Sequence, residues 1–89
     1  MCTYGTVRVP LRGAAKGRHG WFAVDDAGVY VDHPYFSTAT HTLNLDFRDA
    51  AAGPDARVAV ELSLESAREL AGAIATVLKE YAEFTAGPG

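Results

Sequence analysis

Residues 41–47 read HTLNLDF, and this stretch decides the fold. Apolar and polar side chains alternate along it, with Leu43, Leu45 and Phe47 on one face and Thr42, Asn44 and Asp46 on the other. Alternation with a period of two predicts a β-strand that is buried on one face. Residues 29–32, VYVD, alternate in the same way. The two segments therefore predict neighbouring strands of a one-sided antiparallel sheet.

Three further segments have strand character, namely residues 3–9, 21–24 and 57–62. Pro10 ends the first of them, because proline cannot donate a hydrogen bond to a ladder. Residues 12–20 contain three glycines and predict a loop, and the DDAG stretch at residues 25–28 predicts a turn. Short connections favour antiparallel neighbours. We therefore expect a meander sheet of about five strands.

The C-terminal part of the chain predicts one helix. Ser63 is the expected N-cap, since its hydroxyl can accept a hydrogen bond from a backbone N–H of the first turn. Large apolar residues then follow at helical spacing and form one stripe: Leu70, Ile74, Val77, Tyr81 and Phe84. The sequence thus predicts an α+β fold with this helix packed on the apolar face of the sheet. We expect a single domain over residues 1–89, with residues 85–89 as a frayed tail.

The composition restricts the class of protein. The chain has 89 residues, of which 48% are hydrophobic, and a formal net charge of −3, which together predict one small globular domain. No apolar run approaches the roughly 20 residues that span a bilayer. The acidic balance argues against nucleic acid as a partner. Cys2 is the single cysteine, which excludes an internal disulfide and favours a reducing compartment, so we expect a cytoplasmic protein.

Two histidines form the candidate site. The register that gathers the apolar side chains on one face pairs Val31 with Leu43 and places His33 opposite His41. Cross-strand Cβ atoms lie about 4.5–5.5 Å apart, so the two imidazoles can touch, share a proton or hold one metal ion. The pair is expected at the end of the sheet, on the same face as the core.

Two functional interpretations of this pair are open. As metal ligands, His33 and His41 would bind a divalent ion such as iron or zinc, with a carboxylate or Cys2 as the third ligand. As catalytic residues, they would act as acid and base on a small organic substrate near neutral pH. Tyr35 and Phe36 in the adjoining loop would line the ligand site. In the structural alternative, the histidines only close the end of the sheet.

Asn44 and Asp46 form a second polar row, together with Thr42. Alternation directs this row to the face opposite the histidines. It is either the solvated outer face of the sheet or a second ligand-binding pocket.

The helix also predicts an assembly. Ala67, Ala71 and Ala75 recur every four residues, and Gly72 lies beside them. Small residues let another backbone approach closely, and one helix cannot bury both a large and a small stripe against one sheet. We therefore expect a homodimer through the C-terminal helix. Alternatively, the alanines are only neutral helix formers.

Several strings of the chain carry a resemblance: MCTY at residues 1–4, KG followed by GWF at residues 16–22, DHP at residues 32–34, HTLNLDF at residues 41–47, and residues 53–62. With these strings the chain resembles a family of small bacterial proteins of unknown function. The resemblance covers nearly the whole chain and implies no activity, but its strings include His33 and His41.

The sequence therefore predicts a small homodimer with a cross-strand histidine pair that binds a small molecule or a metal ion. Acid–base catalysis would be an extension of that site, and the question of an enzyme stays open. The alternative is a non-catalytic protein-interaction module with structural histidines.

Overall fold

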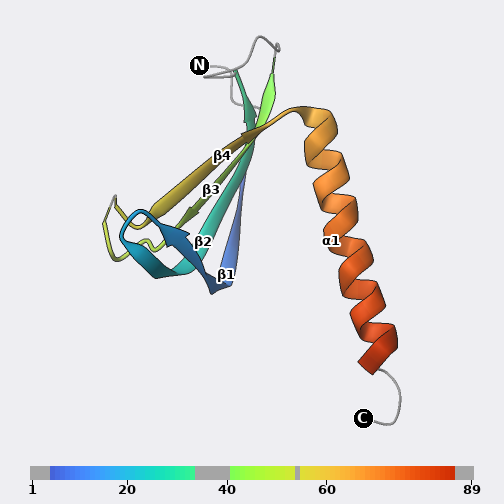
Figure 1. Ribbon diagram of the computed structural model, residues 1–89. Helices are drawn as coiled ribbons and strands as arrows, with labels where there is room; N and C mark the ends of the chain where they lie inside the picture. Colours follow the sequence, from blue (N-terminus) through green and yellow to red (C-terminus); the bar gives the residue numbers. More distant parts are fainter. Residues whose placement is uncertain (1–4, 34–40, 54, 86–89) are drawn as a thin grey trace.

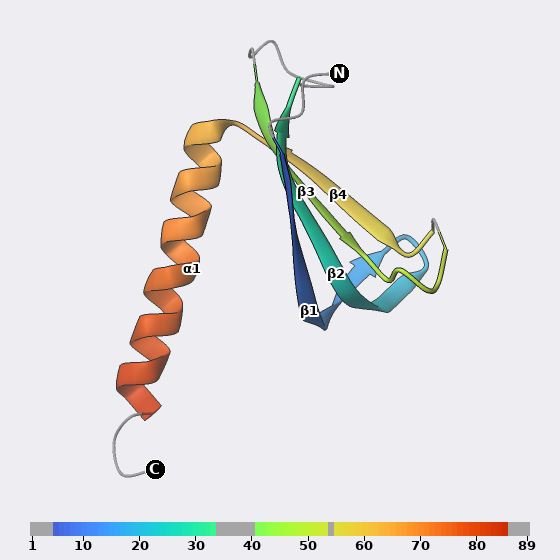
Figure 2. The same ribbon diagram turned by 180° about the vertical axis from the view of Figure 1, so that it is seen from behind.

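The computed structural model describes residues 5–33, 41–53 and 55–85. Four antiparallel strands form one sheet in chain order, and a long helix follows them. The elements are β1 (Thr6–Gly17), β2 (Gly20–Asp32), β3 (Thr42–Arg48), β4 (Arg57–Leu62) and α1 (Leu64–Thr85). Figures 1 and 2 show the sheet and α1 joined near one end and diverging toward the other. The predicted α+β meander with a C-terminal helix is confirmed.

The pairing of β2 with β3 has the predicted register. Val29 pairs with Leu45, and Val31 pairs with Leu43. β4 continues these rows on the other side of β3. Since successive side chains alternate between faces, one face of the sheet is apolar and the other is polar.

The expected turn at residues 25–28 is wrong, and the sheet has four strands, close to the predicted number of about five. β2 runs unbroken through these residues, which leaves four strands. The two aspartates have other partners: Asp25 accepts a hydrogen bond from the Ala50 N–H at 3.1 Å, and Asp26 binds arginines of β1 and β3. Because these contacts hold the two carboxylates, Asp25 and Asp26 lie within a continuous strand and do not form a turn.

The expected loop at residues 12–20 is also wrong. β1 continues past Pro10 to Gly17 and forms a long hairpin with β2. The proline is tolerated because β1 is an edge strand and the register shifts between Pro10 and Gly13. Gly20 follows the two-residue turn with a φ of 110°, a conformation that favours glycine.

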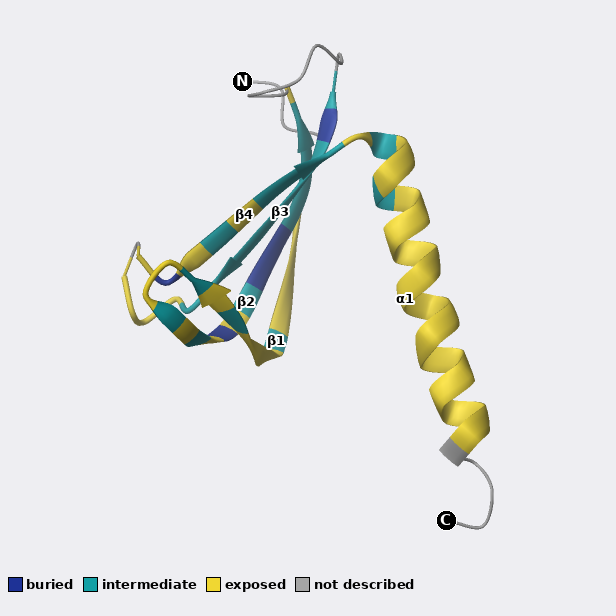
Figure 3. Ribbon diagram, viewed as in Figure 1, coloured by how far each residue is buried: buried dark blue, intermediate teal, exposed yellow. Residues whose placement is uncertain are grey.

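The interior of the molecule is small. Within the described part of the chain, the buried apolar residues are Val24, Ala27 and Ala56. Only the first turns of α1 approach β3 and β4, and its large apolar side chains are exposed, from Leu70 at 43% to Phe84 at 86%. Figure 3 shows α1 exposed along most of its length. The helix therefore meets the sheet near one end and does not cover it as a layer.

Candidate functional site

The imidazole rings of His33 and His41 stack at the end of the β2–β3 pair. Their centroids are 5.2 Å apart and their planes differ by 23°. His33 directly follows β2 and His41 directly precedes β3, beside the pairing of Asp32 with Thr42. The His33 residue is exposed and His41 is half-buried. The structure thus brings together the two rings that the register places opposite each other.

The strand ends that carry the rings are fixed by hydrogen bonds. Asp32 Oδ1 accepts from the backbone N–H of His33 at 2.7 Å. On β3, the Asn44 amide nitrogen donates to the Thr42 carbonyl oxygen at 3.2 Å and to Thr42 Oγ1 at 3.5 Å. Thr42 is only 1% exposed. These contacts hold the backbone from which both imidazoles project.

The stacked arrangement differs from that of two ligands on one ion. An imidazole lone pair lies in the plane of its ring, so two stacked rings direct their lone pairs side by side and not toward one point. Within residues 5–33, 41–53 and 55–85, no group of three or more His, Cys, Asp or Glu side chains could hold a metal ion. The candidate third ligand Cys2 and the candidate lining residues Tyr35 and Phe36 lie outside the described residues.

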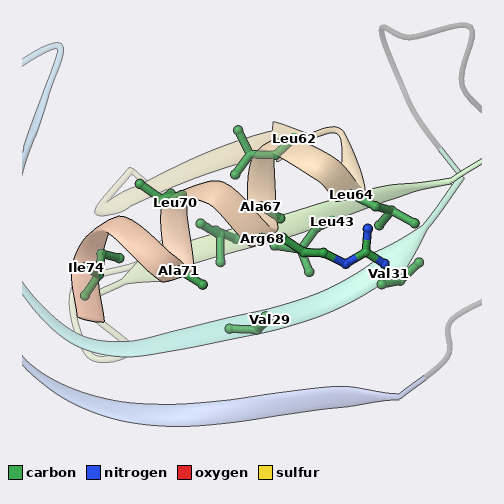
Figure 4. A pocket seen from close by; sticks show the side chains of 11 residues that line it. Val29, Val31, Leu43, Leu62, Leu64, Ala67, Arg68, Leu70, Ala71 and Ile74 are labelled. Atoms are coloured by element: carbon green, nitrogen blue, oxygen red, sulfur yellow. The ribbon is translucent and has the colours of Figure 1, made fainter. Parts of the chain in front are cut away.

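An apolar cleft of about 500 Å³ opens between the first turns of α1 and the sheet. Figure 4 shows Val31 and Leu43 on the sheet side and Leu64 and Ile74 on the helix side. By strand alternation, the two histidines continue the rows of Val31 and Leu43. The pair is therefore expected next to the Val31–Leu43 end of the cleft, and neither ring is among the described residues that line it.

Arg68 is the charged residue that lines this cleft, and sequence reasoning missed its role. Figure 4 shows its side chain extending along the sheet toward Val31 and Leu64. The spacing of Arg68 one turn after Leu64 is the signal that could have placed both residues at the same end of the cleft. The guanidinium adds a positive charge to an otherwise apolar site.

The sequence suggests two separate stripes on α1, one of large apolar residues and one of alanines. In the structure they form one surface. Ala67 and Ala71 line the cleft together with Leu70 and Ile74. Small and large apolar side chains thus form one broad apolar face of α1.

The opposite face of the sheet carries a network of charges. Asp26, on β2, is bound by Arg8 of β1 and by Arg48 Nε of β3 at 2.8 Å. The hydrogen bonds from Arg8 and Arg48 lower the pKa of Asp26, and the hydrogen bond to Asp26 raises the pKa of Arg8. The network ties three strands together on the solvent side.

Asn44 and Asp46 lie on this polar face, as alternation predicts, and not beside the histidine rings. Asp46 accepts a hydrogen bond from Arg57 Nε at 2.6 Å, which raises the pKa of Arg57. Asn44 lines a surface hollow of about 430 Å³, and Asp46 lines another of about 390 Å³. A ligand-binding role for these two residues stays a prediction, separate from the histidine site.

A comparison with protein families finds a match over residues 1–86 to a family of unknown function, DUF6295. The chain belongs to the DUF6295 family. The resemblance to a family of unknown function is thereby confirmed, and membership of DUF6295 assigns no activity. No curated protein and no solved structure matches the chain. Among its described residues, this DUF6295 member has no helix that is long and apolar enough to cross a membrane.

Proposed function

We propose that this protein is a homodimeric ligand-binding protein of the cytoplasm. Its ligand is a small molecule with an apolar body and an anionic group, held at the end of the α1–sheet cleft. The observation that carries the proposal is the stacked pair of His33 and His41, 5.2 Å apart, at the end of the apolar face that lines the cleft. The cytoplasmic location is supported by the single cysteine.

The chemistry of the cleft supports this class of ligand. Its volume of about 500 Å³ is in the range of small-molecule sites, which combine apolar walls with a few polar groups. The polar group that lines the cleft is the Arg68 guanidinium, and the two imidazoles lie on the adjoining strand ends, two residues beyond Val31 and two residues before Leu43. A guanidinium only donates hydrogen bonds, and imidazoles donate through their ring N–H groups. Oxygen acceptors of an anionic group satisfy such donors.

The exposed surface supports the homodimer. The chain exposes 6894 Å², whereas a folded monomer of this mass exposes about 5,000 Å². The radius of gyration is 15.5 Å, compared with about 12 Å for a compact domain of this length. A standard interface buries about 800 Å² per partner. The excess of roughly 1,900 Å² over the monomer expectation is more than such an interface requires.

Titration with the fluorescent apolar anion anilinonaphthalene sulfonate tests the ligand site. We expect saturable binding of one probe per chain. His33→Ala and His41→Ala, which remove the donor, should each weaken it about tenfold, which corresponds to the loss of a hydrogen bond to a charged group. His19→Ala, in the exposed turn between β1 and β2, is the matched control and should bind as the wild type does. Equal affinity in all four proteins would refute the site.

Zinc or iron binding by the same two rings is the second candidate function. It is favoured by the short distance between the rings, although the side chains would have to rotate before both lone pairs met one ion. Metal analysis of protein purified without a histidine tag tests it. Stoichiometric metal that is lost in both His33→Ala and His41→Ala would establish a metal site. Acid–base catalysis by the pair stays a prediction.

If neither the probe titration nor the metal analysis shows a role for the histidines, the protein is better described as a non-catalytic interaction module. In that case both histidine variants bind probe and metal as the wild type does, and the rings only close the end of the sheet. The homodimer does not depend on either test, because it rests on the exposed surface of α1.

A further inference from the structure

The apolar face of the sheet is wide enough for two helices. Four strands at a spacing of about 4.8 Å span roughly 19 Å, and a helix is about 10 Å across. α1 contacts mainly β3 and β4, and the cleft beside it reaches Val29 and Val31 of β2. On the edge strand β1, Val7 pairs with Val29 and shares its face, and the Val7 side chain is 64% exposed. The β1 side of the apolar face therefore lacks a covering helix in the described chain.

The C-terminal half of α1 carries the matching surface. Its large apolar side chains point along one broad face and are 62–86% exposed: Val77, Leu78, Tyr81 and Phe84. A helix of 22 residues is about 33 Å long, and its first turns alone reach the sheet of its own chain. The exposed apolar side chains of α1 in one chain could therefore pack on the exposed apolar face of the sheet in another.

The charges of α1 select the direction of the second helix. Glu65, Arg68 and Glu69 lie near its start, Lys79, Glu80 and Glu83 lie near its end, and its last turn has no basic residue. An antiparallel pair with full overlap is centred between residues 74 and 75, and it places Arg68 level with residue 81 of the partner. Each arginine then lies between two partner glutamates and near the negative end of the partner's helix dipole. Glu69 is level with Glu80 of the other copy, which is one like-charge contact, whereas a parallel pair in register would place every charge level with its own copy.

We infer that the helix that covers the β1 side of the sheet is α1 of a second copy, which lies antiparallel to the first α1. The inference rests on the homodimer of the proposed function and adds its geometry. Ala71 and Ala75 lie near the centre of the crossing, where small side chains let the two backbones approach. The partner helix also lies along the open side of the cleft and supplies the wall that the single chain lacks.

Cross-linking between single cysteines tests the antiparallel geometry. In a Cys2→Ser background, Ala67→Cys and Ala82→Cys are prepared separately, and the two proteins are also refolded as a mixture. In the antiparallel pair, residue 67 of one copy is level with residue 82 of the other, while two copies of residue 67 are about 22 Å apart along the axis. A short bismaleimide should link the mixture and neither protein alone.

A charge exchange provides an independent measurement. Arg68→Glu should raise the dissociation constant of the dimer several-fold, and adding Glu83→Arg to the same chain should restore it, because the exchanged charges again face each other. Circular dichroism of each variant establishes that α1 is still formed. If Glu83→Arg fails to rescue, the assigned pairing is wrong.

The outcomes separate this inference from the homodimer itself. A dimer in which each cysteine variant cross-links with itself is parallel, and it would overturn the inference while the homodimer stands. A folded 9.4 kDa monomer at micromolar concentration, measured by size-exclusion chromatography with light scattering, would overturn both.

Discussion

Gly28 lies directly beneath the guanidinium of Arg8. A Cβ at residue 28 would be 3.2 Å from Arg8 Nη1 and 3.7 Å from Arg8 Cζ. The missing side chain gives Arg8 a path across β2 to the carboxylate of Asp26, with an Nε to Oδ1 distance of 3.4 Å. The glycine and the ion pair are thus one structural unit, although 20 residues separate Gly28 from Arg8 in the sequence.

A double-mutant cycle should reveal this coupling. In an Arg8→Ala background, Gly28→Ala should raise the free energy of unfolding by about 0.5–1 kcal/mol, because alanine loses less conformational entropy in a strand than glycine does. In the wild-type background that gain should be smaller or absent, since the new Cβ displaces Arg8. Denaturant unfolding of the four proteins at one fixed concentration measures the difference. Equal effects in both backgrounds would show that Gly28 and Arg8 are independent.

Asp26 should make stability depend on pH in the acid range. Its pKa is lowered from 3.8 by the hydrogen bonds from Arg8 and Arg48, so the unfolded chain binds the proton more readily than the folded chain. The stabilisation is therefore present above pH 3.8 and is lost as the pH falls through the lower folded value. Thermal unfolding between pH 6 and pH 2 should show a shallower decline in Asp26→Asn than in the wild type, and Asp55→Asn serves as the exposed control.

The cap of α1 offers a local test of helix stability. Ser63 Oγ accepts a hydrogen bond from the Ser66 N–H at 3.0 Å. Ser63→Ala should lower the free energy of unfolding by about 1 kcal/mol, because the N–H loses its partner at the helix start. Ser66→Ala removes a hydroxyl of the same helix but keeps the cap, and it should change the stability by less. A larger loss in Ser66→Ala would contradict the role of Ser63.

The apolar face of α1 should make stability depend on protein concentration. If α1 is buried between two copies, the melting temperature of the wild type rises with concentration. Val77→Asp places a charge on the apolar face and should abolish this rise. Thr76→Asp places the same charge about 100° away on the polar side and should preserve it. The melting temperature of the three proteins is measured at protein concentrations that span two orders of magnitude. A wild-type melting temperature that does not change with concentration would contradict the prediction.

Alternation and capping were sufficient to predict part of this fold. The β2–β3 register agrees with alternation in both strands, because a slip by one residue would turn a whole apolar set to the other face. The hydrogen bond of Ser63 confirms the predicted N-cap. The proximity of His33 and His41 follows from the same register, and so does the direction of Asn44 and Asp46.

Other features depend on contacts that are remote in the sequence. The glycines and basic residues of residues 12–17 hide their strand character, which becomes clear only from the pairing of Ala14 with Ala23 and of Ala15 with Phe22. Asp26 has turn chemistry in isolation and becomes a strand residue because two arginines from other strands bind it. The cleft beside Arg68 requires the angle between α1 and the sheet, which no local pattern specifies.

The few buried apolar side chains in the described part of the molecule have a consequence for the living cell. Val24, Ala27 and Ala56 provide little stability by themselves, so the proposed homodimer would provide much of the rest. The fraction of folded protein would then depend on how much of it the cell makes. At low expression, single chains with an exposed helix would be degraded by proteases, and at higher expression they would pair and persist. The abundance of the protein would thus have a threshold that is set by its own assembly.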